Sequence, residues 1–487
     1  MMNYVSFGYY GLLVILLALY YVLPLKYRWL ALLAGSGCFY WLAVEDWQQL
    51  VVFAVTIGIS YVFGVLISCL KEREIKVKHQ QMILFLGIVL SIFPLLGSKS
   101  TDFFLGCIVH RQKLSWIVPL GLSFYSLQVV AYLADIYKGR TECQKNLLKY
   151  ALFISFFPQI IQGPIPRYDQ MKEQLFEGHT YDSDRFMKGI QLIIWGFFLK
   201  FMIANKASII VDTVFNNHMA YQGCFVLVAG VLYSFQLYAD FQSCVVMSQG
   251  VSQMFGIELT DNFHHPYFSR SIKEFWRRWH ISLSNWLRDY VYIPLGGNRG
   301  GQFRKYLNLI LTFAVSGIWH GGSWKYLFWG LMHAGYQICG DLTKNIQEKV
   351  YGFLRMPANS RLRRLVQQFC TFGLVMTAWI IFRADSLMTG LKMIWSIFTC
   401  FNPWILLNSS LFRLGLHQKE CEILVLSLFV LLCVSRLQER GICIRDWFAR
   451  QHLIVRWGIY FCAICGIWVF GTYGYGFDAN DFIYGGF

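Results

Sequence analysis

Charged residues are scarce in this sequence. Only 14% of the 487 residues are charged, whereas 56% are apolar. A water-soluble domain usually carries about a quarter charged residues. A chain with so little charge cannot cover a particle of this size with polar surface. The composition therefore excludes a soluble globular protein and predicts that lipid covers part of the surface.

The apolar residues gather in runs long enough to cross a bilayer, for which a helix needs roughly 20 residues. Shorter runs at 150–165 and 386–405 are ambiguous, because a re-entrant or interfacial helix also fits them. We expect an all-α polytopic membrane protein with about 10–12 spans plus re-entrant or interfacial helices. The clear candidate spans are 8–25, 29–43, 48–70, 81–97, 116–137, 187–206, 219–240, 305–319, 324–340, 366–384, 422–435 and 455–474.

Three other features are missing from the sequence. The first apolar run has no basic leader and no A-x-A-like site, so we expect no cleavable signal peptide. Many of the 14 cysteines lie in apolar runs, including the Cys462 and Cys465 pair, where cysteine acts as a small hydrophobe. We therefore predict neither a metal site nor a disulfide framework. No evident repeat relates the two halves, which counts against a transporter.

The loops carry a surplus of positive charge, and the net charge is +16. We attribute it to cytoplasmic loops near anionic lipid and expect no nucleic-acid partner. The basic loops at 26–28, 71–78 and 138–149 then lie in the cytoplasm, and the N-terminus lies outside. Arginines also precede the last span, whereas the tail after it has two acids and no base. We expect one membrane domain over 1–475 and an extracellular tail over 476–487.

The first candidate for chemistry is His280, in an amphipathic segment rich in Trp and Arg. Helical spacing would place Trp276, Ser284 and Arg288 on the same face as this histidine. The residues alone allow two interpretations. The segment could be an interfacial helix, with tryptophans at the lipid boundary and arginines on phosphates, or it could carry a functional histidine.

The second candidate is His320, in a Gly-rich stretch between two apolar runs. Such a histidine is either a satisfied core group or a group that transfers protons near neutral pH. Its glycine neighbours permit a close backbone approach or a helix break. His333 lies thirteen residues later, at about 220° on an unbroken helix, and would not share a face with His320. We therefore assign His333 to packing or support of the site.

Several motifs in order resemble the membrane-bound O-acyltransferase superfamily. The first is Phe275-Trp-Arg-Arg-Trp-His-Ile-Ser-Leu-Ser-Asn-Trp-Leu-Arg-Asp-Tyr-Val-Tyr-Ile-Pro-Leu-Gly-Gly-Asn-Arg299, and the second is Gly317-Ile-Trp-His-Gly321. Segments 119–128, 132–137 and 156–168 agree, so the resemblance spans about 115–340. The chain looks most similar to the bacterial alginate O-acetyltransferase branch, which is related to the D-alanyl transfer protein of teichoic acid modification.

This resemblance implies a helical bundle with a central tunnel, in which a cytoplasmic acyl donor meets an acceptor from the other side. His320 matches the invariant catalytic histidine of the superfamily, and His280 matches its second active-site position. One segment departs from the branch, because Val246 stands where relatives carry an aspartate. The residues expected to bind the donor or support the site are Trp276, Arg277, Arg278, Ser284, Arg288, Trp319 and His333.

The tail ends in Phe482-Ile-Tyr-Gly-Gly-Phe487, which resembles a short C-terminal motif of some bacterial members. The resemblance implies that Tyr484 briefly carries the acyl group. A phenol with a pKa near 10 is easier to deprotonate than an aliphatic alcohol and leaves more easily from an ester. The residues alone favour an interfacial aromatic anchor, and only the resemblance favours the acyl carrier.

The sequence thus predicts an enzyme of the bacterial plasma membrane that moves an acyl group, most plausibly acetyl, from acetyl-coenzyme A or another thioester to a hydroxyl. No permanently bound cofactor is expected. The expected partners are a polysaccharide or teichoic acid acceptor and an extracellular or membrane-tethered SGNH-type acyltransferase. Two alternatives stay open: transfer of D-alanyl or another acyl group to teichoic acid, and a non-catalytic transporter of an acylated carrier.

Overall fold

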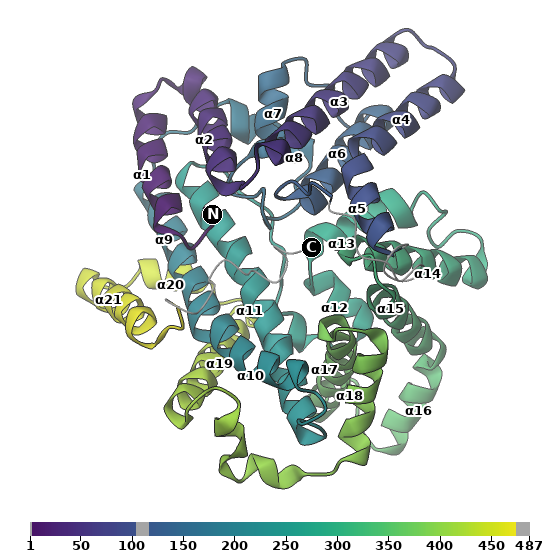
Figure 1. Cartoon of the computed structure of the whole chain (residues 1–487), viewed down its shortest axis with the longest axis vertical. Coiled ribbons are helices and arrows are strands. Elements are labelled where there is room, and N and C mark those ends of the chain that lie inside the picture. The colour runs from purple at the N-terminus through teal and green to yellow at the C-terminus, as the bar shows by residue number, and fades with distance from the viewer. Residues whose placement is uncertain (1, 104–115, 474–487) are drawn as a thin grey trace. The chain divides into compact units, whose positions relative to one another are not determined.

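The computed structural model of the protein describes residues 2–103 and 116–473. Every regular element in these ranges is a helix (Figure 1), as the sequence predicted. The contacts divide the chain into two compact units. The first unit contains the residues up to Gly196 together with Ser243–Asp261, and the second contains Phe197–Gln242 together with the described residues from Asn262 onward. A single domain over 1–475 stays a prediction.

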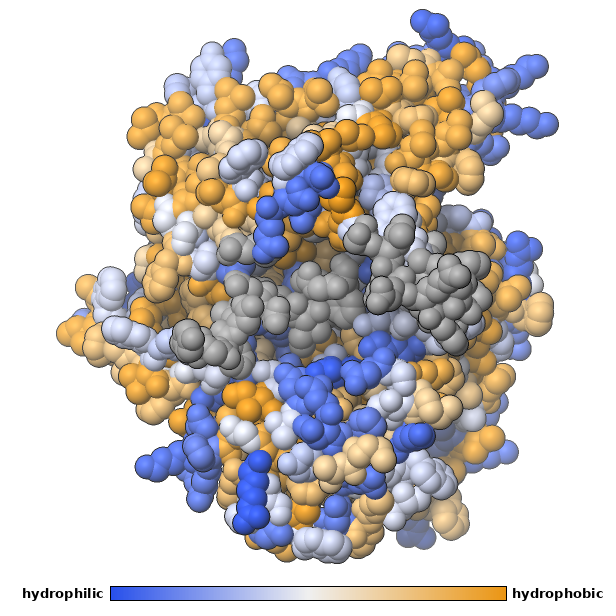
Figure 2. Space-filling view, in the orientation of Figure 1, coloured by the Kyte–Doolittle hydropathy of each residue, from blue (hydrophilic) through white to orange (hydrophobic). Residues whose placement is uncertain are grey.

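The first unit is built from nine consecutive helices before α11 returns to it. The long helices α3 and α4 pack against each other as a hairpin. Figure 2 shows hydrophilic residues at the tip of this hairpin, where the basic loop 71–78 lies, and apolar residues along its sides. The helices are α1 (Phe7–Val22), α2 (Arg28–Ala43), α3 (Trp47–Glu72), α4 (Val77–Ser91), α5 (Phe93–Phe103), α6 (Leu122–Lys138), α7 (Leu147–Ser155), α8 (Tyr168–Phe176) and α9 (Ser183–Phe197), with the short turn η1 (Leu25–Tyr27).

The second unit holds both candidate histidines. Its α14 and α15 form a hairpin, and α12 and α17 pack against α15. Its elements are η3 (Phe198–Ala204), α10 (Asn205–Asn216), α11 (Cys224–Met254, shared with the first unit), η4 (Pro266–Phe268), α12 (Ile272–Arg278), α13 (Ile281–Leu287), η5 (Arg288–Tyr292), α14 (Gly301–His320), α15 (Trp324–Leu342), α16 (Lys344–Phe353), α17 (Arg361–Arg383), α18 (Leu387–Thr399), η6 (Pro403–Leu406), η7 (Ser409–Arg413), α19 (Gln418–Glu439), α20 (Ile444–Ala449) and α21 (Leu453–Phe470).

Within the described residues, each of the twelve apolar runs singled out in the sequence overlaps at least one helix; run 81–97 is divided between α4 and α5, and run 187–206 continues from α9 through η3 into α10. Five described segments are long and apolar enough to cross a membrane alone, and the pair α4–α5, bent by 58°, would make a sixth. These five are Trp47–Glu72, Ser183–Asn216, Cys224–Met254, Arg361–Arg383 and Leu453–Phe470. A polytopic chain is therefore confirmed, while the expected number of spans stays a prediction.

The two ambiguous runs contain only short helices. In 150–165, α7 ends at Ser155 after nine residues, which is about 14 Å of helix and too short to cross a bilayer. In 386–405, α18 has thirteen residues and is followed by η6. Both segments have the length expected of re-entrant or interfacial helices.

A buried ion pair joins two helices of the second unit. The element η3 is a π-helix, a form that often marks functional sites. It presents Lys200, whose Nζ lies 2.6 Å from Oδ1 of Asp240 on α11. Both side chains are almost completely buried. Buried charges need such pairing, because an isolated charge away from water is very costly. The pair therefore fixes η3 against α11 at Asp240, the residue before Phe241.

The departure from the family pattern does not interrupt α11, which stays helical through 242–250. Val246 is buried, and its side chain lies within van der Waals distance of a Cβ placed on Gly196. An apolar residue is therefore accommodated by helix packing at this position.

Candidate active site

The segment around His280 is not one continuous helix. α12 ends at Arg278 and α13 begins at Ile281, and His280 between them has a left-handed backbone with φ 44° and ψ 56°. The expectation that His280 shares one helical face with Trp276, Ser284 and Arg288 is therefore wrong. The imidazole contacts Phe241 and Trp319, whereas Trp276, Ser284 and Arg288 line a cavity that His280 does not line.

His280 is buried among aromatic rings. Its ring meets Phe241 edge-on, with centroids 4.8 Å apart, and lies 6.1 Å from the ring of Trp319. Burial lowers the pKa of His280 to about 3, because the charged imidazolium is disfavoured away from water. The side chain is thus a neutral imidazole at physiological pH, able to donate at one nitrogen and accept at the other.

His320 is placed by a close crossing of α14 and α15. A Cβ on Gly317 would lie 2.4 Å from the carbonyl oxygen of Tyr326, and a Cβ on Gly330 would lie 2.2 Å from that of Phe313. Only glycine permits these two backbones to touch, as in closely packed membrane helices. The close approach that the sequence allowed for Gly317 is therefore confirmed, and the hairpin brings the end of α14 onto α15.

The three histidines lie in one aromatic cluster. The ring of His320 has centroid distances of 4.8 Å to Trp319 and 5.0 Å to Trp329. Trp329 in turn lies 5.1 Å from His333. Together with the contact of His280 and Trp319, these rings connect all three imidazoles. α14 ends at His320, and a new helix, α15, begins at Trp324. The angle of about 220° expected between His320 and His333 on one unbroken helix therefore does not apply.

His333 supports the site through Trp276. The indole Nε1 of Trp276 donates a hydrogen bond of 3.2 Å to Nδ1 of His333. Because Nδ1 accepts this bond, a neutral His333 carries its proton on Nε2. The pair ties α12 to α15 and orients the indole, which agrees with the expected supporting role.

Several buried polar atoms of this cluster have no hydrogen-bond partner within the described part of the chain. They are Ser316 Oγ, one helical turn before His320, together with Trp329 Nε1 and His333 Nε2. Leaving a buried polar atom unpaired costs about 1–3 kcal/mol. Such atoms call for water or a ligand, and here they surround the ring neighbours of His320.

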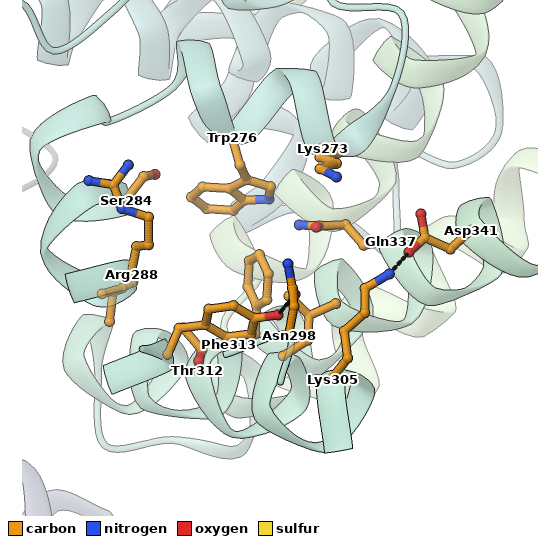
Figure 3. Close-up of a pocket in the computed structure, with 13 residues that line it drawn as sticks. Lys273, Trp276, Ser284, Arg288, Asn298, Lys305, Thr312, Phe313, Gln337 and Asp341 are labelled. Carbon is orange, nitrogen blue, oxygen red and sulfur yellow. Dashed lines mark hydrogen bonds and ion pairs between the residues drawn. The ribbon is translucent and has the colours of Figure 1, made fainter. Parts of the chain in front are cut away.

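A cavity of about 510 Å³ lies beside the cluster, enclosed by α12, α13, η5, α14 and α15. Figure 3 shows Lys273, Trp276 and Gln337 facing its interior, with Lys305 bound to Asp341 at 2.5 Å. The indole of Trp276 and the ring of Phe313 form an aromatic wall. Trp276 contacts Trp329 at 5.8 Å, and Trp329 contacts His320 at 5.0 Å, so two indole rings connect the cavity to His320. The lining residues are Lys273, Trp276, Ser284, Leu287, Arg288, Tyr292, Asn298, Lys305, Leu309, Thr312, Phe313, Gln337 and Asp341.

The cavity contains three of the residues expected to bind the donor, namely Trp276, Ser284 and Arg288. Arg277 and Arg278, which lie between Trp276 and Ser284 in the sequence, do not line the cavity. Arg277 is exposed, and Arg278 forms ion pairs with Glu274 and Glu439 at 2.7 and 2.8 Å. Their expected donor contact stays a prediction.

The sequence interpretation missed most of the polar residues of the cavity, among them Lys273, Asn298 and Lys305. Lys273 lies one helical turn before Trp276, and Asn298 lies within the quoted motif, so both could have been found from the sequence. Lys305 could not be found from local spacing, because it joins the others only through the fold.

The root of the C-terminal tail is bound to η3. The amide of Thr472 donates to the carbonyl of Phe201 at 3.0 Å, and Asn205 Nδ2 donates to the carbonyl of Thr472 at 2.9 Å. The ring of Tyr473 lies 5.4 Å from that of Phe201. Tyr484 lies outside the described residues, so its role stays a prediction.

Comparison with known proteins supplies the family. The family model of MBOAT, the membrane-bound O-acyltransferase family, matches residues 144–361 and so includes both histidines and the whole cavity. The probable alginate O-acetylase AlgI of Azotobacter vinelandii is 36% identical over 400 residues, which cover 80% of this chain and 76% of the relative. The chain belongs to the membrane-bound O-acyltransferase family. It is therefore a membrane acyltransferase, and the transporter alternative finds no support.

Two further relatives of this membrane-bound O-acyltransferase carry different names. The peptidoglycan O-acetyltransferase of Helicobacter pylori is 32% identical over 366 residues, covering 69% of this chain and 68% of the relative. The teichoic acid D-alanyltransferase of Bacillus subtilis is 30% identical over 307 residues, covering 61% of this chain and 76% of the relative. The resemblance stated from the motifs is confirmed.

Proposed function

We propose that this protein transfers an acetyl group from cytoplasmic acetyl-coenzyme A to a hydroxyl and thereby serves O-acetylation of an exported or cell-wall polysaccharide. Two of the three relatives above are named as O-acetylating enzymes, and both are more similar than the D-alanyltransferase. The observation that carries the proposal is the cluster around His320, which contains buried polar atoms without a partner among the described residues and is connected to a lysine- and arginine-lined cavity through Trp276 and Trp329.

In the proposed reaction, His320 acts as the general base. It takes the proton of the acceptor hydroxyl while the oxygen attacks the thioester carbonyl carbon. The carbon–sulfur bond then breaks, and the proton passes to the departing coenzyme thiolate. Neutral His280 is suited to donate a hydrogen bond to the carbonyl oxygen as negative charge develops there.

The cavity is the proposed binding site of the donor. Lys273, Arg288 and Lys305 suit its phosphates, and the indole of Trp276 offers a flat apolar surface beside them. Ser284 and Asn298 add hydrogen-bonding groups. To reach His320, the acyl end must pass the wall formed by Trp276 and Phe313.

The acceptor in this proposal is Tyr484 or a sugar hydroxyl. With the tail outside the cell, an acyl-tyrosine would pass its group to an extracellular or membrane-tethered SGNH-type transferase. The tail root on η3 supports this route, because it fixes the starting point of the segment that carries Tyr484. Transfer of D-alanyl to teichoic acid is the second candidate, favoured by the similarity to the Bacillus subtilis enzyme.

Donor turnover by the purified protein tests the role of His320. We expect wild type to release free coenzyme thiol from acetyl-coenzyme A, and His320→Ala to lose this activity by about 10²–10⁴-fold, the usual contribution of a general base. His320→Gln keeps a polar side chain of similar size but cannot take up the proton, and should lose activity equally.

The control is His264→Ala, which removes an exposed histidine ring near the site. It should retain wild-type turnover. If His320→Gln released thiol at the wild-type rate, proton transfer by this residue would be wrong. A preference for a D-alanyl thioester over the acetyl thioester would instead favour the second candidate.

A further inference from the structure

Two backbone hydrogen bonds join the turn that contains His280 to residues 262–264. The amide of His264 donates to the carbonyl of Arg278 at 2.9 Å, and the amide of Ile281 donates to the carbonyl of Asn262 at 2.9 Å. These two bonds lie on either side of Trp279 and His280. The ring of Phe263, between the two partners, packs against Trp279 with centroids 4.9 Å apart.

The side chain of Asn262 extends this bracket into α13. Its Oδ1 accepts hydrogen bonds from the amide of Ser282 at 3.0 Å and from Ser282 Oγ at 2.7 Å. A backbone N–H can only donate, so the amide atom facing it must be the oxygen. Asn262 is 1% exposed, which shields both bonds from water.

Asn262 thus caps the start of α13, a role usually filled by the residue that immediately precedes the helix. The residue before a helix normally uses its own side chain to accept from the first free amides. His280 occupies that position for α13, but its side chain makes no capping bond. Asn262 satisfies the amides of Ile281 and Ser282 instead, so the imidazole is not committed to the helix end.

The same bonds hold His280 in an unfavourable backbone conformation. A left-handed conformation is strained for any residue with a side chain, and it persists where the surroundings impose it. Asn262 fixes the two residues that follow His280, while His264 fixes Arg278 before it. In this conformation the imidazole contacts Phe241 and Trp319, and Trp319 in turn contacts His320.

We infer that Asn262 is a positioning residue for acyl transfer: it caps α13 from another segment and so holds the imidazole of His280 against Trp319, a ring neighbour of His320. This inference rests on the proposed role of His280 in the reaction. Asn262 does not line the donor cavity, so it acts on the rate of transfer and not on donor binding.

Steady-state turnover of acetyl-coenzyme A tests the inference. We expect Asn262→Ala to lower kcat at least tenfold and leave KM within about twofold, since loss of a cap of about 1.4 kcal/mol corresponds to tenfold. Asn262→Asp keeps an acceptor for both Ser282 donors and should recover most of kcat. An Asp variant as slow as the Ala variant would contradict the inference.

The control is Asn402→Ala. Asn402 Oδ1 accepts from the amide of Cys224 at the start of α11 at 2.8 Å, so it is also a capping asparagine from another segment. Removing it should lower the unfolding temperature about as much as Asn262→Ala does, with kcat unchanged. An equal fall of kcat in both variants would mean that Asn262 has a structural role only.

A double variant separates this inference from the function on which it rests. If Asn262 acts through His280, Asn262→Ala combined with His280→Gln should be no slower than His280→Gln alone. Losses that multiply would overturn the positioning role of Asn262 and leave the role of His280 intact. Wild-type turnover in His280→Gln would overturn both.

Discussion

His280 combines a buried imidazole with a backbone conformation that its side chain disfavours. At an ordinary helical position, Ala is more stable than Gly by roughly 0.5–1 kcal/mol. At the left-handed position of His280 the order should reverse, because Gly adopts this conformation without strain. We expect His280→Gly to be more stable than His280→Ala by about 1 kcal/mol, measured by thermal unfolding in detergent.

The same pair of substitutions at Lys349, exposed on α16, gives the ordinary order for comparison. Both variants at His280 lose the same imidazole contacts, so the difference between them reports the backbone alone. Equal stability of the two would contradict the left-handed conformation assigned to His280.

At the scale of single residues, the motifs predicted the candidate residues but not their local backbone geometry. His280 and His320 could be singled out from their neighbours in the sequence. The left-handed turn could not, because helical spacing assumes an unbroken helix. Histidine is more frequent than most residues at positive φ, but positive φ is still uncommon for any residue other than glycine, so its presence alone does not mark a turn. Asn262 was missed for a related reason: its partner Ser282 lies twenty residues away.

At the scale of elements, the donor cavity depends on cationic side chains from several helices. Lys273 comes from α12 and Arg288 from η5. We expect Lys273→Gln and Arg288→Gln each to raise KM for acetyl-coenzyme A about fivefold, near 1 kcal/mol, as expected for partly exposed ion pairs. KM for acetyl-pantetheine, which lacks the nucleotide and its phosphates, should not change. Turnover at varied donor concentration measures both.

Arg270→Gln is the matched control, since Arg270 is exposed two residues before α12 and does not line the cavity. Equal increases of KM for both donors would place the phosphates elsewhere and contradict the proposed site.

The helices themselves were largely predictable, because bilayer-length apolar runs leave few alternatives to a helix. Contacts between elements were not. Lys200 and Asp240 are separated by 40 positions and meet only because η3 and α11 pack together. The cavity likewise joins α12 to Lys305 on α14 and Asp341 on α15. Such pairs depend on tertiary packing, which local periodicity does not encode.

At the scale of the whole molecule, the tail provides the sharpest test of the route taken by the acyl group. We expect Tyr484→Phe to abolish surface acetylation while the amount of protein in the membrane stays normal, because phenylalanine has no hydroxyl to esterify. Acetyl content of cell-surface polymer and immunodetection in membranes measure the two quantities.

The control is Tyr473→Phe, which changes a tyrosine at the tail root and retains the aromatic ring that contacts Phe201. It should support normal acetylation. Undiminished acetylation in Tyr484→Phe would return this residue to the role of an interfacial anchor. The outside location of both termini, inferred from loop charge, remains a prediction at this scale.

The glycine crossing of α14 and α15 has a consequence for how donor preference can change. The separation of these helices is set by main-chain atoms at Gly317 and Gly330, whereas the cavity is shaped by side chains of the same helices, including Thr312, Phe313 and Gln337. If the cavity binds the donor as proposed, substitutions in its wall alter donor preference without shifting His320. Directed evolution of new donor selectivity should accordingly retain both glycines and draw its changes from the wall.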